Sequence, residues 1–194
     1  MVSGMIPNLE DKDASIRLEA VLYIGNYVRV DEDAFKAIPK VGELALGDED
    51  WLVRREAVRV IARALEAKKD ALDELTVYND CTGKHYSMRK YILAVLEDAL
   101  EDVMPAVRSA AARALGFVDE SDRDDAIYLL LKALRDVDSD VRSAAALALG
   151  RIGDQSVLGE LSRLAFDLNE EERTATDAFC SFRLIIRRMS GSNS

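Results

Sequence analysis

Apolar residues recur at fixed offsets around one arginine, and these offsets trace one face of a helix. In the segment "LRDVDSDVRSAAALALG" (134–150), apolar side chains stand one residue before Arg142 and three, six and seven residues after it. At about 100° per residue, these positions share one side of an α-helix. The face predicted in this way consists of Val141, Ala145, Ala148 and Leu149. Its alanines permit the close approach of a neighbouring helix.

The same arrangement returns around Arg17, Arg54 and Arg108 and, in weaker form, around Arg173. The five arginines are separated by 37, 54, 34 and 31 residues. A second apolar segment with helical periodicity precedes most copies, and these segments occupy residues 31–46, 88–100, 124–134 and 156–166. The chain is therefore predicted to repeat a unit made of a helix, a polar turn and a second helix.

A single amphipathic hairpin of this kind cannot cover its apolar face, so the units must stack on one another. Strands would show strict alternation of apolar and polar residues, and no such pattern stands out. We therefore predict an all-α fold, an α-solenoid of about five stacked helix-turn-helix repeats, with about ten helices and no sheet. Residues 1–188 are expected to form one repeat domain, and residues 189–194 a flexible C-terminal tail.

An aspartate stands six residues before each of the five arginines, in the turn between the two helices of a unit. An aspartate near a helix N-terminus accepts backbone N–H bonds and complements the helix dipole. The arginine, in the first turn of the second helix, is able to reach the aspartate of its own or an adjacent unit. We predict that these residues form a structural ladder rather than a catalytic site. The ladder comprises Asp11, Arg17, Asp48, Arg54, Asp102, Arg108, Asp136, Arg142, Asp167 and Arg173.

The shared pattern L-x-D-x4-[VI]-R-x2-A-x3-[IL]-G resembles HEAT repeats and is most similar to the short HEAT-like repeats of the phycobilisome-lyase type. Residues 100–120 and 134–154 carry it almost completely, and the resemblance extends from residue 9 to about 188. It implies a superhelical solenoid whose second helices line the concave surface. Pro39, inside a predicted first helix, resembles the proline that bends this helix in many HEAT units. The resemblance does not imply one function, because such solenoids include adaptors, lyases, hydroxylases and DNA glycosylases.

Composition narrows the class of partner. Hydrophobic residues make up 49% of the 194, which excludes a mostly disordered chain. The formal net charge of −10 argues against bulk electrostatic binding of nucleic acid or of an anionic membrane surface. No apolar run approaches the ~18 residues of a membrane helix, no signal peptide is evident, and the two cysteines suggest no disulfide framework. We expect a cytoplasmic protein.

The separation of 54 residues indicates an insertion at about 67–85, between the second and third units. It contains Cys81 and the only histidine, His85. Two such residues are fewer than the three or four ligands that zinc requires, so we expect no metal. The segment is either a projecting loop that meets a partner or an ordinary long connection.

The exposed side of the second helices is the main candidate for binding. Positions one and five residues after each arginine point away from the apolar face, and the position nine residues after it lies at the flank. The candidate partner-binding residues at these positions are Leu18, Leu22, Arg55, Arg59, Arg63, Arg113 and Arg151. One interpretation is a solvated face whose arginines pair with nearby acids. The other is a groove for an acidic segment, with the two leucines as an apolar anchor.

No motif for catalysis is present: the chain has one histidine, no glycine-rich phosphate loop and no His-Glu pair of the kind that HEAT-like deoxyhypusine hydroxylases use to bind iron. We therefore predict a non-catalytic scaffold or adaptor, without a cofactor, that binds a protein or peptide segment on its concave face. The alternative is a phycobilin lyase, or a chaperone subunit of one, acting on a chromophore-bearing protein. The sequence does not indicate the oligomeric state.

Overall fold

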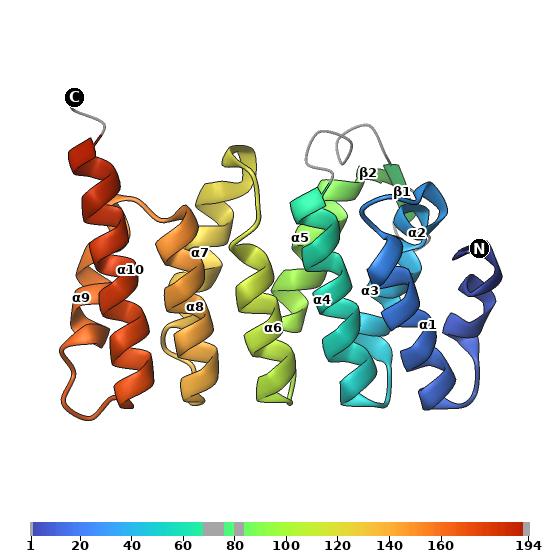
Figure 1. The fold of residues 1–194 in the computed structure, drawn as a ribbon, viewed down its shortest axis with the longest axis horizontal. Helices are drawn as coiled ribbons and strands as arrows, with labels where there is room; N and C mark the ends of the chain where they lie inside the picture. Colours follow the sequence, from blue (N-terminus) through green and yellow to red (C-terminus); the bar gives the residue numbers. More distant parts are fainter. Residues whose placement is uncertain (1, 68–75, 80–83, 192–194) are drawn as a thin grey trace.

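The computed structural model describes residues 2–67, 76–79 and 84–191, and these residues form a row of stacked helices. Figure 1 shows the second helices of the units side by side in one layer, with the first helices behind them. The second helices are α1 (Ala14–Tyr27), α4 (Trp51–Ala67), α6 (Pro105–Leu115), α8 (Ser139–Ile152) and α10 (Glu172–Gly191). The first helices are α2 (Glu32–Lys36) with α3 (Ile38–Gly47), α5 (Met88–Ala99), α7 (Arg123–Ala133) and α9 (Leu158–Ala165). In the first unit, two short 3-10 helices, η1 (Val2–Gly4) and η2 (Ile6–Glu10), take the place of a first helix, and two more, η4 (Glu120–Asp122) and η5 (Gln155–Val157), precede α7 and α9.

Each second helix packs against its own first helix and against the second helices of the adjacent units. Thus α4 contacts α1, α3 and α6, and α8 contacts α6, α7 and α10. The apolar offsets fall on the buried side, as Val141, Ala145 and Leu149 are fully buried. The prediction of an all-α solenoid of stacked helix-turn-helix units is confirmed.

Close stacking depends on the glycine that ends the repeated pattern. A Cβ atom added to Gly150 would lie 2.6 Å from Ser181 Oγ, and one added to Gly25 would lie 2.6 Å from Val60 Cγ2. At Gly116 the corresponding atom would be 3.1 Å from Ala148. These residues are glycine because the next second helix leaves no room for a side chain.

Pro39 divides the predicted helix at 31–46 into two. The chain forms α2 up to Lys36 and restarts as α3 at Ile38, so that Pro39 occupies the second position of the new helix. Proline has no N–H to donate and its ring clashes with the carbonyl four residues earlier, whereas the first turn of a helix accepts it readily. The expected bend is therefore a complete break.

One further expectation was wrong in detail. The insertion contains a short antiparallel hairpin, in which β1 (Thr76–Asn79) pairs with β2 (Lys84–Ser87), although no sheet was predicted. Only four residues contribute to each strand, too few for an alternating pattern to be recognised. At the other end, α10 continues to Gly191, and the flexible tail expected at 189–194 stays a prediction. The division of the chain at about 67–85 stays a prediction, because residues 68–75 and 80–83 lie outside the described residues.

Candidate functional site

The turns between helices hold a row of arginine–carboxylate pairs that join consecutive units. Each arginine donates from Nε and Nη2 to both oxygens of an acid in the next unit: Arg17 to Asp48 at 2.7 and 2.8 Å, and Arg54 to Asp102 at 2.6 and 3.0 Å. Arg108 binds Asp136 in the same way, at 2.8 and 2.7 Å. We call this row the inter-unit seam. Two parallel N–H···O bonds of this kind are the strongest form of arginine–carboxylate pair.

The six-residue spacing serves a backbone bond within the unit. Arg17 Nη1 donates to the carbonyl oxygen of Asp11 at 2.8 Å, and Arg54 Nη1 donates to that of Asp48 at 2.8 Å. The carboxylate of Asp48 points instead to the preceding unit and also accepts the backbone N–H of Asp50 at 2.9 Å. The first four ladder arginines therefore each bind a carbonyl of their own turn and a carboxylate of the next turn. Asp11 takes part through its carbonyl, while its side chain accepts the N–H of Asp13.

Burial makes these pairs sensitive to the loss of either partner. The side chains of Arg17 and Asp48 are only 10% and 1% exposed. Burial by itself would raise the pKa of Asp48, but the bonds from Arg17 and the Asp50 amide outweigh it and hold that pKa below its usual value. The same balance lowers the pKa of Asp102 and of Asp136. These carboxylates are therefore ionised and fully bonded, as scaffold residues would be.

The last unit departs from the predicted ladder at both of its residues. Arg142 pairs with Glu170, at 2.8 Å from Nε, and not with Asp167. The side chain of Asp167 accepts the N–H of Asn169, and Arg173 donates to Asp140 of the preceding unit at 3.0 Å. The physical reason is register: the other ladder arginines are the fourth residue of their helix, whereas Arg173 is the second residue of α10. Its pair with Asp140 is exposed, at 65% and 63%.

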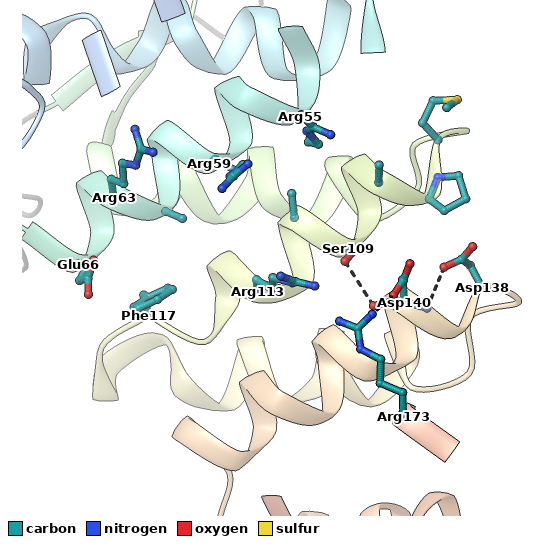
Figure 2. Close-up of a pocket in the computed structure, with 15 residues that line it drawn as sticks. Arg55, Arg59, Arg63, Glu66, Ser109, Arg113, Phe117, Asp138, Asp140 and Arg173 are labelled. Carbon is teal, nitrogen blue, oxygen red and sulfur yellow. Dashed lines mark hydrogen bonds and ion pairs between the residues drawn. The ribbon is translucent and has the colours of Figure 1, made fainter. Parts of the chain in front are cut away.

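We call the exposed side of the second helices the second-helix face. A hollow of about 720 Å³ lies on this face, lined by residues of α4, of α6 and of the start of α8, with Arg173 of α10 at one side. Figure 2 shows Arg55, Arg59 and Arg63 in order along α4, with Arg113 opposite them on α6. We call this hollow the arginine groove. Four of the seven predicted partner-binding residues line it.

Small side chains on α6 create the space. Ala106, Ser109 and Ala110 line the groove between the longer side chains of α4 and α8. Ser109 stands one residue after Arg108, an offset predicted to point away from the buried face. That prediction is wrong here, because Ser109 is buried and its hydroxyl donates to the carbonyl oxygen of Asp140 at 3.3 Å. The short alanine and serine side chains on α6 thus leave space between the longer arginine side chains of the groove.

The charges in the groove are partly balanced from within. Glu56, which lies beneath the groove and not in its lining, accepts bonds from Arg55 at 3.0 and 2.9 Å and from Arg59 at 3.2 Å, all at Oε1. The guanidinium of Arg55 also lies 5.2 Å from the centre of the Trp51 ring, in cation–π geometry. The predicted interpretation of a solvated, paired face therefore describes Arg55 well.

Arg63 and Arg113 differ from these two. Within the described part of the chain, neither makes an ion pair or a side-chain hydrogen bond, and Arg113 is exposed. Of the acids in the lining, Glu66 pairs with Arg29 and Asp140 pairs with Arg173. Asp138 caps the N-terminus of α8 through the N–H groups of Asp140 and Val141. The groove therefore presents two guanidinium groups whose charge is not matched locally.

The other predicted partner-binding residues lie elsewhere. Leu18 and Leu22 line a separate hollow of about 470 Å³ on α1, beside the start of α4, together with the acids Glu19 and Asp50. Arg151 lies outside the arginine groove and lines another hollow with Arg188. Its guanidinium stacks 4.6 Å from the centre of the Phe117 ring, and Phe117 in turn lines the groove. Of the seven predicted residues, four therefore line the arginine groove and three line two other hollows.

In the residues that the structure describes, no group of three or more His, Cys, Asp or Glu side chains is placed to hold a metal ion. His85 lies in β2, while Cys81 falls outside the described residues. No helix in the described part of the chain is long and apolar enough to cross a bilayer.

Comparison with known proteins supports the repeat. Residues 92–179 match the HEAT repeats family, which confirms the predicted resemblance. Over 77 residues the chain is 35% identical to the Hsp70 nucleotide exchange factor FES1 of Coccidioides immitis (strain RS). That alignment covers 37% of this chain and 36% of the exchange factor, so the match spans about a third of the curated relative.

Among solved structures, computationally designed armadillo repeat proteins for modular peptide recognition are similar over most of their length. The TM-score is 0.64 at 18% identity, with 95% of this chain and 82% of that chain covered, and this likeness shows the fold alone. The complex of CpcE and CpcF of phycocyanin lyase from Nostoc sp. PCC7120 gives a TM-score of 0.35 at 19% identity, with 98% and 92% covered. A likeness at that level carries no argument about activity.

Proposed function

We propose that this protein is a non-catalytic adaptor that binds an acidic peptide segment of a partner protein in the arginine groove. One observation carries the proposal: Arg63 and Arg113 line a hollow on the second-helix face without an ion pair in the described residues. A guanidinium binds carboxylates through a fixed fork of donors, and several such groups along a hollow suit an extended segment that presents acidic side chains.

The whole-chain charge strengthens this reasoning. The formal net charge is −10, yet five arginines stand against three acids in the lining of the groove and Glu56 beneath it, a local excess of one positive charge. Such a local reversal in an acidic protein guides an acidic segment to one place and repels it from the rest of the surface. Leu18 and Leu22, in the neighbouring hollow on α1, stay candidates for an apolar anchor on the same face.

The phycobilin-lyase alternative stays a prediction that no observation on this structure favours. The activity of the Hsp70 nucleotide exchange factor belongs to that protein, because the match covers 36% of it. An Hsp70 is nevertheless a defined protein to look for among the captured partners.

The test is co-purification from the source organism with a double charge reversal, Arg59→Glu with Arg113→Glu. The wild type is expected to capture a defined partner with an acidic segment, and the reversed protein to lose it. Capture by the wild type is also expected to weaken with added salt, because exposed charges are screened over about 8–10 Å near physiological ionic strength.

A matched control is the reversal Lys90→Glu with Arg187→Glu. Both residues are exposed, neither lines the arginine groove, and neither has an ion pair in the part of the chain that the structure describes. The control changes the net charge by the same amount and is expected to leave capture unchanged. Identical partners for all three proteins would contradict the proposal.

A further inference from the structure

Glu56 has no acidic counterpart in the two units that follow. It stands two residues after the ladder arginine Arg54, and the same offset holds Ala110 in α6 and Ala144 in α8. Its side chain is 10% exposed and lies beneath the guanidinium groups of Arg55 and Arg59. A buried carboxylate is stable in its ionised form only where charged donors bond to it. Glu56 therefore needs the bonds from Arg55 and Arg59, and these bonds in turn fix the positions of the two guanidinium groups.

The three bonds to Glu56 engage the two arginines unequally. Arg55 donates from Nε and Nη2, the edge that grips a carboxylate best, and its guanidinium also lies over Trp51. Arg59 donates from Nη1 alone, and its side chain is 55% exposed. A ligand therefore has to displace Glu56 to use the best edge of Arg55, whereas the corresponding edge of Arg59 makes no bond within the described residues.

The opposite end of the groove is open to a ligand. Figure 2 places Arg63 at the end of α4 where Glu66 and Phe117 also lie, away from Arg55. Neither Arg63 nor Arg113 has a carboxylate partner in the described ranges 2–67, 76–79 and 84–191. The arginine at one end of the groove, Arg55, is therefore paired within the protein, whereas Arg63 at the other end has no carboxylate partner in the described residues.

We infer that Glu56 is a built-in counter-ion that competes with the ligand for Arg55 and Arg59. It confines the acidic group of the partner to Arg63, Arg113 and the outer edge of Arg59. This inference rests on the proposed function and narrows the partner to a segment with a short acidic cluster, not a long acidic run. Ala62, Ala110 and Phe117 also line the groove, so an apolar side chain beside the acidic cluster has apolar surface to contact.

The test measures the binding of a fluorescently labelled peptide of ten glutamates by fluorescence anisotropy at low salt. Glu56→Gln keeps the shape of the side chain and removes its charge, so the neutral amide oxygen binds Arg55 more weakly and competes less with the ligand. We expect this variant to bind the peptide about three- to tenfold more tightly than the wild type, the range that one or two exposed ion pairs contribute. A peptide with three consecutive glutamates among glycines and serines is expected to gain less, because it reaches fewer arginines.

Glu19→Gln is the matched control for net charge. Glu19 occupies the same offset in α1, is exposed, and lines the hollow beside Leu18 and not the arginine groove. Its neutralisation is expected to change the affinity by less than about twofold, because solvent and salt screen an exposed charge at that distance. Equal affinities for Glu56→Gln, Glu19→Gln and the wild type would overturn the inference and leave the proposed function standing, provided that Arg59→Glu with Arg113→Glu still abolishes binding.

Glu56→Asp separates contact from charge and is available if Glu56→Gln fails to fold. It keeps the charge but is one methylene shorter, so it withdraws from Arg55. A gain in affinity with this variant supports displacement of Glu56, and no gain with either variant overturns it. If no protein in the series binds either peptide, the proposed function fails and the inference falls with it.

Discussion

Arg54 and Arg55 are consecutive residues of α4, yet they belong to two regions with opposite properties. Arg54 is buried in the inter-unit seam, where its guanidinium binds both oxygens of Asp102 and the carbonyl of Asp48. Arg55 turns about 100° around the helix to the second-helix face, where its side chain is partly exposed and bonded to Glu56. The comparison teaches that the residue type does not decide the role of an arginine in this fold. The set of acceptors that the adjacent turn presents decides it.

The largest effect should follow from breaking the most buried pair of the seam. Arg17→Ala leaves Asp48 buried without its charged partner, and we expect a loss of about 3–5 kcal/mol in the free energy of unfolding. Arg55→Ala, the comparison variant from the second-helix face, should cost less, about 1–2 kcal/mol, because Arg59 still bonds the buried Glu56. Urea denaturation followed by circular dichroism measures both. Equal midpoints for the two variants would remove the distinction between the regions.

A change of pH should act on the seam through its aspartates. Because the folded pKa of Asp48 lies below its unfolded value, the pair contributes fully above about pH 4 and loses its contribution as the pH falls through the folded pKa. Asp48→Asn removes the titrating group, so its stability deficit relative to the wild type should narrow by about 1–3 kcal/mol between pH 6 and pH 2. Unfolding curves across this range provide the measurement. A deficit that is constant with pH would show that the ionised form of Asp48 is not what the seam stabilises.

The smallest effect is expected where the seam gives way to an exposed pair. Arg173→Ala removes the exposed contact with Asp140 and should change the free energy of unfolding by less than about 1 kcal/mol. Arg142→Ala, one unit earlier, removes the partner of the nearly buried Glu170 and should cost about 1–3 kcal/mol. Thermal unfolding of the two variants side by side distinguishes them. A larger loss of stability for Arg173→Ala than for Arg142→Ala would favour the predicted ladder, in which Arg173 is a structural residue like the other four arginines.

The fold was predictable because periodicity and stacking are properties of the sequence alone. The offsets around Arg142 identified the buried face of α8, and the six-residue spacing identified the turn that precedes it. The acid with which each arginine pairs was not predictable from the sequence. Pairing within the unit or with the next unit depends on the distance between the turns of adjacent units, which only the fold determines. Glu170 illustrates this: α10 begins two residues later than the pattern around Arg173 implies, and the longer glutamate then reaches Arg142 where Asp167 does not.

The candidate site was predictable only in part. Helical offsets placed Arg55, Arg59, Arg63 and Arg113 on one face, and these four do line one groove. The same offsets could not show that Arg151 stacks on Phe117, because that contact joins two units. They also missed Glu56, whose burial depends on its packing and not on its neighbours in the sequence. The adjacent letters "RRE" at 54–56 were the available signal, but the sequence does not show which of the two arginines is buried and which is partly exposed.

In the seam, each arginine bonds to an acid of the following unit, and this order affects how further repeat units could be added to the chain. Every interior unit supplies an acceptor to the arginine before it and a donor to the acid after it, as Asp136 and Arg142 do on either side of one turn. A tandem gene duplication of the segment that carries α7 and α8 would therefore insert a matched acceptor and donor together. The old bonds would be re-formed across the new junction without a compensating mutation. A duplicated unit whose aspartate had been lost would instead leave one buried guanidinium without its carboxylate, so an added unit would fit the seam only if it kept this turn residue.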